Sequence, residues 1–199
     1  MIKFIYFDIG GVLVKDFSST HKWRELKRSI GIGTEQDEAF DKFFANYESE
    51  ICVNKDIETL LPLITKEFGL SFSKNYSFLR DFVNRFDKNE SIVPVINSIR
   101  KDIKLGLLSN MYPDMLNLIK ENKLMPDIKW NVIIDSSVEG MLKPEKRIYK
   151  LAQKRAGVNP NRMLYVENRK TNTEVKWQKR WGGKHSFMIH LTIKKQVKT

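Results

Sequence analysis

Short, almost continuous apolar runs recur along the chain, and polar residues follow them. Apolar residues dominate the runs Ile2 to Phe7, Ile103 to Leu108, Trp130 to Ile134 and Met163 to Val166. Such runs are typical of strands covered on both faces, as in parallel sheets. Helical spacing predicts helices at Val93 to Arg100, Met115 to Lys123 and Glu145 to Ala156. This alternation predicts an α/β fold with a doubly wound parallel sheet.

A long segment with helical spacing interrupts the alternation after the first strand. It runs from residue 16 to residue 89, and we expect it to be helical throughout. Its apolar residues recur every three or four positions, which is the helical period. We therefore predict a core formed by residues 1–15 and 90–199, with residues 16–89 inserted as a helical cap over the functional site.

Aromatic residues mark the interior of this predicted cap. Those with helical spacing are Phe40, Phe43, Phe44 and Tyr47. We interpret them as core packing rather than as a ligand cage, because large apolar side chains usually face the core. A second apolar stripe ends at Gly69, where we expect a helix to stop.

Polar residues follow the predicted strands, and they are the candidate site. Asp8 follows the first strand, Ser109 and Asn110 follow the second, and Glu167 and Asn168 follow the last. In open α/β sheets, ligands bind beyond the carboxyl ends of the strands, so these residues should converge. A hydroxyl and an amide there can bind an anionic oxygen without adding charge. A plain turn aspartate is the alternative interpretation of Asp8.

A lysine is expected at the same edge of the sheet. Lys143 directly precedes Pro144, which begins the predicted helix that runs to Ala156. Proline in the first helical turn places Lys143 on a loop rather than on a helix surface. A solvated surface lysine is the simpler alternative.

Composition limits the choice of partners and compartment. The net charge is +11, but seven basic residues and no acid lie in residues 176–199, so residues 1–175 carry only +4. The single cysteine, Cys52, gives neither an internal disulfide nor a metal-binding spacing, and we expect it to be a small buried residue. The start reads as a strand rather than a signal peptide, and no apolar run is long enough for a membrane span. We therefore expect a soluble, cytoplasmic protein with no membrane partner.

The motifs resemble, in their order, those of the haloacid dehalogenase superfamily of hydrolases. They are F-D-I-G-G-V-L around Asp8, L-L-S-N around Ser109, G-M-L-K-P around Lys143 and L-Y-V-E-N ending in Asn168. The position of the helical insert is similar to the capped branch, which has a Rossmann-like core. The segment Y-E-S-E-I, residues 47–51, is similar to a cap segment of the small sugar-phosphate phosphatases, including glucose-1-phosphatase-like members.

The resemblance implies a magnesium-dependent phosphatase that acts on a small phosphorylated metabolite through an aspartyl-phosphate intermediate. Asp8 would be the nucleophile, Ser109 would hold a phosphoryl oxygen, and Lys143 would neutralise developing negative charge. These three are the implied catalytic residues. The implied substrate contacts are Ser109, Asn110 and Gly11. The implied Mg²⁺ ligands are Asp8, the carbonyl of Gly10, Glu167 and Asn168.

Two residues depart from the family pattern. Gly10 stands where the phosphatases usually carry a second aspartate as general acid and base, and losing such a group typically costs about 10²- to 10⁴-fold in rate. The loss should be smallest for leaving groups that depart without a proton. Asn168 stands where a second acid is usual, and its neutral amide should bind a hard cation more weakly. Dehalogenation, which needs no metal, is an alternative reaction within the superfamily.

The basic tail departs furthest from the family. Lys176 to Lys184 reads K-W-Q-K-R-W-G-G-K, which is unlike a core helix. One choice of codons for residues 176–194, read from the third base, spells M-A-K-A-M-G-W-K-T-F-F-Y-D-S-S-N-Y-K, which is similar to the missing family ending. We therefore favour a frameshift near Val175. The rival interpretation is a nucleic-acid-binding extension. The alternative function is a catalytically impaired protein of this fold, with a binding role or as a damaged product.

Overall fold

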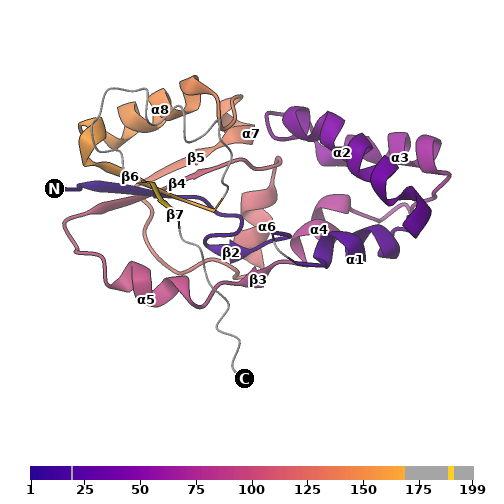
Figure 1. Ribbon diagram of the computed structural model, residues 1–199, viewed down its shortest axis with the longest axis horizontal. Coiled ribbons are helices and arrows are strands. Elements are labelled where there is room, and N and C mark those ends of the chain that lie inside the picture. The colour runs from indigo at the N-terminus through magenta and orange to yellow at the C-terminus, as the bar shows by residue number, and fades with distance from the viewer. Residues whose placement is uncertain (19, 169–187, 191–199) are drawn as a thin grey trace.

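Five of the described strands form one parallel sheet at the centre of the protein (Figure 1). The structure is a computed structural model, and it describes residues 1–18, 20–168 and 188–190. The sheet order is β5-β4-β1-β6-β7. The bounds are β1 (Phe4–Phe7), β4 (Lys104–Ser109), β5 (Val132–Asp135), β6 (Met163–Glu167) and β7 (Met188–His190). All neighbours in this sheet pair in parallel, which confirms the predicted doubly wound α/β fold.

Alternate residues of the strands pack against opposite layers of helices. Phe4 and Tyr6 of β1 pack with α8 (Lys146–Ala156), whereas Ile5 and Phe7 face the layer that contains α5 (Ile92–Asn97) and α6 (Met115–Glu121). Figure 1 shows α8 and α5 on opposite sides of the sheet. A short helix, α7 (Ser136–Glu139), follows β5, and a 3-10 turn, η3 (Pro160–Arg162), precedes β6. Both faces of the sheet are covered, as the continuous apolar runs predicted.

One glycine makes room for the aromatic residues of the central strand. Gly106 of β4 lies opposite Tyr6 in the parallel register. A Cβ at position 106 would lie 2.7 Å from Tyr6 Cε1 and 2.8 Å from Phe4 Cε1. Any side chain there would therefore overpack the layer beneath α8.

The segment after the first strand forms a separate group of helices, here called the helical insert (residues 22–83). Figure 1 shows it beyond the carboxyl ends of the strands. It contains α1 (Lys22–Ser29), η1 (Thr34–Gln36), α2 (Asp37–Ile51), η2 (Ile57–Leu60), α3 (Leu61–Phe68) and α4 (Phe78–Val83). Gly69 ends α3 in the left-handed conformation, with φ of 69°, as predicted.

The expectation that residues 16–89 are helical throughout is wrong, because residues 16–18 precede the first helix and a short strand lies at residues 87–88. The short strands β2 (Val14–Lys15) and β3 (Asp87–Lys88) pair antiparallel where the chain enters and leaves the insert. This pairing joins residues more than seventy positions apart, so local periodicity could not reveal it. The boundaries of core and cap at residues 15/16 and 89/90 remain a prediction, and this antiparallel pair of strands lies close to both of them.

Aromatic packing forms the core of the helical insert. Phe40 and Phe44 of α2 are buried, which confirms the core interpretation for these residues. The Phe40 ring lies 5.2 Å from the Phe68 ring of α3, and the Phe44 ring lies 4.9 Å from the Trp23 ring of α1. Edge-on contacts at these distances stabilise packing beyond simple area burial. These contacts hold the helices of the insert together, and their buried residues belong to the same apolar cluster as one face of the sheet.

The tail enters the described structure only at β7, which pairs in parallel with β6. A strand from Ser186 to Ile193 is expected from its alternating pattern, and this expectation is met at Met188–His190. Trp177, Trp181 and the proposed frameshift site lie outside the described residues. Within the described residues, no helix is long and apolar enough to cross a membrane.

Candidate active site

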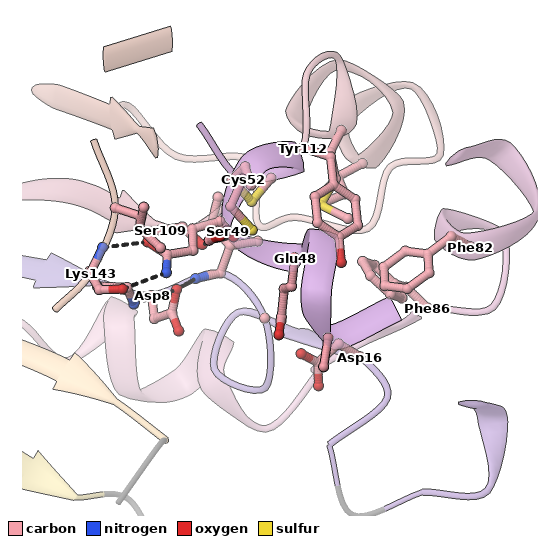
Figure 2. A pocket seen from close by; sticks show the side chains of 18 residues that line it. Asp8, Asp16, Glu48, Ser49, Cys52, Phe82, Phe86, Ser109, Tyr112 and Lys143 are labelled. Carbon is pink, nitrogen blue, oxygen red and sulfur yellow. Dashed lines mark hydrogen bonds and ion pairs between the residues drawn. The ribbon is translucent and has the colours of Figure 1, made fainter. Parts of the chain in front are cut away.

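A cavity of about 320 Å³ lies where the sheet edge meets the helical insert. The core contributes residues near the ends of β1 and β4 and from the loop before α8, while the insert contributes α2 and the region of α4 (Figure 2). Its polar lining residues include Asp8, Asp16, Glu48, Ser49, Ser109, Asn110 and Lys143. Its apolar lining residues include Phe82, Phe86, Met111, Tyr112, Met115 and Ile119. The cavity therefore has a charged floor on the sheet and an apolar wall.

A buried charge network forms the floor of the cavity. Lys143 Nζ lies 3.1 Å from Asp8 Oδ1 and 2.5 Å from Glu167 Oε2. All three residues are at most 8% exposed. Burial raises the pKa of Asp8 from 3.8 to about 6; Lys143 opposes this rise, and the Glu167 charge adds to it. The lysine therefore lies between two carboxylates, as a buried charge requires.

Strand pairing explains why these acids meet. The register places Phe7 of β1 opposite Val166 of β6, and the Asp8 N–H donates to the Val166 carbonyl at 2.9 Å. Asp8 and Glu167 therefore leave the sheet side by side. The Asp8 carboxylate also accepts a hydrogen bond from the Ile9 N–H at 2.8 Å, which fixes its orientation.

Asn110 holds the lysine loop against the end of β4. Its Nδ2 donates to the Lys143 carbonyl at 2.9 Å, and its Oδ1 accepts from the Lys143 N–H at 2.7 Å. Ser109, the residue before it, is only 2% exposed, and its hydroxyl acts to lower the pKa of the Asp8 carboxyl. The end of β4 therefore places a hydroxyl beside Asp8 and also anchors Lys143.

Ser136 ties the helical insert to the core behind the cavity. Its Oγ donates to the Cys52 carbonyl at 2.5 Å and accepts from the Met111 N–H at 2.8 Å. Cys52 is buried, as predicted, and it also lines the cavity. Ser136 was not among the predicted site residues, although its place directly after a strand was a usable signal.

Asn168 packs on the glycine turn that follows Asp8. Gly11 has a φ of 72°, and a Cβ there would lie 1.8 Å from Asn168 Nδ2. Glycine is therefore required both by the backbone and by this close approach. Asn168 Oδ1 is buried and has no hydrogen-bond partner among the described residues. An unpartnered buried acceptor is costly unless a ligand uses it.

These oxygen donors fit a magnesium ion. Asp8, the Gly10 carbonyl and the Asn168 amide oxygen are hard donors, and Mg²⁺ commonly takes one or two carboxylates and retains several waters. The described residues hold no cluster of three or more His, Cys, Asp or Glu side chains that could bind a metal by themselves. Glu167 is committed to other partners: Oε2 to Lys143 and Oε1 to the Asn168 N–H at 2.9 Å. A metal site here would therefore depend on Asp8 and neutral oxygens.

The structure brings most of the predicted residues together. Asp8, Gly10, Ser109, Asn110 and Lys143 line the cavity. Glu167 supports Lys143 from behind, and Gly11 and Asn168 contact each other beside Asp8. Two acids that were not among the predicted site residues, Asp16 and Glu48, also line the cavity.

A doubly wound sheet that brings an acid, a hydroxyl and a lysine to one cavity is the arrangement of an α/β enzyme. The profile of haloacid dehalogenase-like hydrolases matches residues 2–173, and the chain belongs to this family of hydrolases. No curated protein sequence matches the chain significantly.

Solved structures of the family share the fold. A predicted HAD-like family hydrolase from Porphyromonas gingivalis is 24% identical, with a TM-score of 0.71, covering 94% of this chain and 91% of its own. A HAD family enzyme from Bacteroides thetaiotaomicron, in complex with magnesium and inorganic phosphate, is 17% identical, with a TM-score of 0.68 and 90% coverage of both chains. An L-2-haloacid dehalogenase from Xanthobacter autotrophicus is 23% identical, with a TM-score of 0.61, covering 92% of this chain and 75% of its own.

Proposed function

We propose that the protein is a magnesium-dependent phosphatase that hydrolyses a small phosphorylated metabolite through an aspartyl-phosphate intermediate. The observation that carries this proposal is the convergence of Asp8, Ser109 and Lys143 on one side of a cavity of about 320 Å³. Phosphoryl transfer needs little beyond positioning and charge stabilisation, and these groups supply both.

Each residue has a defined task in this mechanism. A carboxylate oxygen of Asp8 attacks the phosphorus atom, which divides hydrolysis into two easier displacements. The Ser109 hydroxyl donates a hydrogen bond to a phosphoryl oxygen, and the Lys143 ammonium group balances the charge that develops on the transferring group. Asn110 positions Lys143 through the backbone contacts described above.

Magnesium would be held by Asp8, the Gly10 carbonyl and Asn168. When bound, it would neutralise negative charge on the phosphoryl group and orient it toward Asp8. The fold is shared with the Bacteroides thetaiotaomicron enzyme that was crystallised with magnesium and inorganic phosphate, which supports this choice of cofactor.

The helical insert would act as a cap that excludes water and selects the substrate. Glu48 and Ser49 of α2 line the cavity opposite its charged floor, so they would contact hydroxyl groups of the metabolite. A sugar phosphate has this chemistry and suits the cavity volume. We place the reaction in the cytoplasm, in keeping with the single cysteine of the chain.

The decisive experiment is a panel of phosphorylated metabolites, assayed with and without Mg²⁺. We expect magnesium-dependent phosphate release that disappears in Asp8→Asn, because this change keeps the shape and removes the nucleophile. Asp127→Asn, at an exposed aspartate, is the matched control and should leave activity unchanged. Phosphate release that persists undiminished in Asp8→Asn would contradict the covalent mechanism.

A catalytically impaired protein is the second candidate, and Gly10 is the observation that favours it. A glycine at position 10 cannot transfer a proton, so turnover could be lost while binding survives. The same panel separates the two candidates: binding of phosphorylated ligands without turnover would support the impaired protein. Including 2-haloacids in the panel tests dehalogenation as well.

A further inference from the structure

The space that Gly10 leaves beside the nucleophile is filled by the carboxylate of Asp16. A Cβ at position 10 would lie 2.6 Å from Asp16 Oδ2 and 3.4 Å from its Cγ. The carboxylate oxygens of any aspartate are only two bonds from its own Cβ. Asp16 therefore places a carboxylate where the side chain of an acid at position 10 would begin.

Local structure holds Asp16 in this place. It directly follows β2, whose antiparallel pairing with β3 fixes the entry to the helical insert. Asp16 Oδ1 accepts a hydrogen bond from the Ser18 N–H at 2.8 Å, while Oδ2 is the oxygen that faces position 10. Asp16 also lines the same cavity as Asp8 and Lys143 (Figure 2).

We propose that Asp16 is the catalytic acid and base of this hydrolase, in a role that position 10 cannot fill. This inference rests on the proposed phosphatase function and adds a residue to it. The chemistry requires a proton donor, because an alkoxide is a poor leaving group at neutral pH. Lys143 is held between two carboxylates and Asp8 is the nucleophile, so neither is placed for this task.

Asp16 donates a proton in the first half-reaction and accepts one in the second. In the first, Asp8 forms a bond to phosphorus, the bond from phosphorus to the substrate oxygen breaks, and that oxygen takes its electron pair and the Asp16 proton. In the second, water attacks phosphorus and gives a proton to Asp16, while the electron pair of the breaking bond returns to the Asp8 carboxylate. The products are an alcohol and inorganic phosphate, and both side chains are regenerated.

The first test compares leaving groups in Asp16→Asn, which keeps an oxygen to accept from Ser18. We expect hydrolysis of an alkyl phosphate to fall about 10²- to 10⁴-fold. With p-nitrophenyl phosphate, whose leaving group departs without a proton, we expect a rapid burst of about one equivalent of nitrophenolate followed by slow turnover. A purely structural role for Asp16 would slow both substrates alike and give no burst. Glu48→Gln, at the neighbouring cavity acid, is the matched control and should show no burst.

The second test moves the carboxylate to position 10. Gly10→Asp alone should lower the melting temperature, because the new side chain meets Asp16. In an Asp16→Ala background the same change should cost much less stability. The double variant should also recover at least about tenfold of the activity lost in Asp16→Ala. Equal thermal costs of Gly10→Asp in both backgrounds would contradict the contact.

The outcomes separate this inference from the proposed function. Asp8-dependent turnover of alkyl phosphates that stays within about threefold in Asp16→Asn would overturn the role of Asp16 and leave the phosphatase standing. Absence of Asp8-dependent turnover for every phosphate ester would overturn both. Loss of alkyl phosphate hydrolysis together with a nitrophenolate burst would support both.

Discussion

The side-chain amide of Asn110 makes two hydrogen bonds with the backbone of Lys143, at 2.9 Å and 2.7 Å. These residues are thirty-three positions apart, yet the amide pairs with the backbone of Lys143 as one strand pairs with its neighbour, through one donated and one accepted hydrogen bond. The contact makes the end of β4 responsible for two functions. It presents Ser109 to the cavity and positions the only lysine that lines it among the described residues.

Removing the two hydrogen bonds between Asn110 and Lys143 should affect catalysis more than substrate binding. We expect Asn110→Ala to lower the free energy of unfolding by ~1–3 kcal/mol, because two part-buried hydrogen bonds are lost. We expect kcat to fall more than tenfold, with a smaller change in KM, since the proposed role of Lys143 is to balance the charge that develops in the transition state. Asn117→Ala, at an exposed asparagine of α6, is the control. A kcat within about twofold of the wild type would show that the loop needs no such anchor.

Glu167 should matter because it supports Lys143 from behind. Glu167→Gln keeps the shape but leaves the buried lysine with Asp8 as its remaining carboxylate partner. We expect a loss of ~1–3 kcal/mol in the free energy of unfolding, measured by urea denaturation. The control is Glu139→Gln, which breaks a more exposed pair with Arg155 and should cost ~1 kcal/mol or less. Equal costs for the two variants would argue against a supporting role for Glu167.

The sequence was sufficient to predict the sheet and much of the site because both follow from local patterns. The apolar run at Phe4–Phe7 marks a strand wherever it occurs, and the parallel-sheet rule then brings Asp8 and Ser109 to one edge. The role of Asn110 could not be predicted, because it depends on a loop conformation after Gly140. The position of Asp16 beside Gly10 depends on the β2–β3 pairing, which joins residues distant in sequence.

The raised pKa of Asp8 predicts a pH-dependent difference between the wild type and Asp8→Asn. Folding raises this pKa from 3.8 to about 6, so the folded protein must ionise a buried group as the pH rises. Protonated Asp8 therefore contributes to the free energy of unfolding in full below about pH 4, and this contribution is lost as the pH rises through about 6.

We therefore expect metal-free Asp8→Asn to be more stable than the wild type at pH 7, by ~1–3 kcal/mol. The difference should grow between pH 4 and pH 6 and then level off. Thermal unfolding in EDTA across this range measures it. A difference that is constant from pH 4 to pH 8 would show that Asp8 ionises as freely as it does in water.

Restoring an acid at position 168 should strengthen magnesium binding. Asn168→Asp keeps the shape that packs on Gly11, and it replaces a neutral amide oxygen with a carboxylate beside Asp8. Because Mg²⁺ prefers charged oxygen donors, we expect its Kd to fall about tenfold, which corresponds to ~1.4 kcal/mol.

Isothermal titration calorimetry with Mg²⁺ measures this change directly. The metal-dependent rise in melting temperature provides a readout that needs no substrate. Without metal, Asn168→Asp should be less stable than the wild type, because a third carboxylate is then added beside the Asp8–Lys143–Glu167 group. Asn161→Asp, at an exposed position of η3, should change neither quantity. An unchanged Kd for Asn168→Asp would exclude residue 168 from the metal site and leave its buried Oδ1 unexplained.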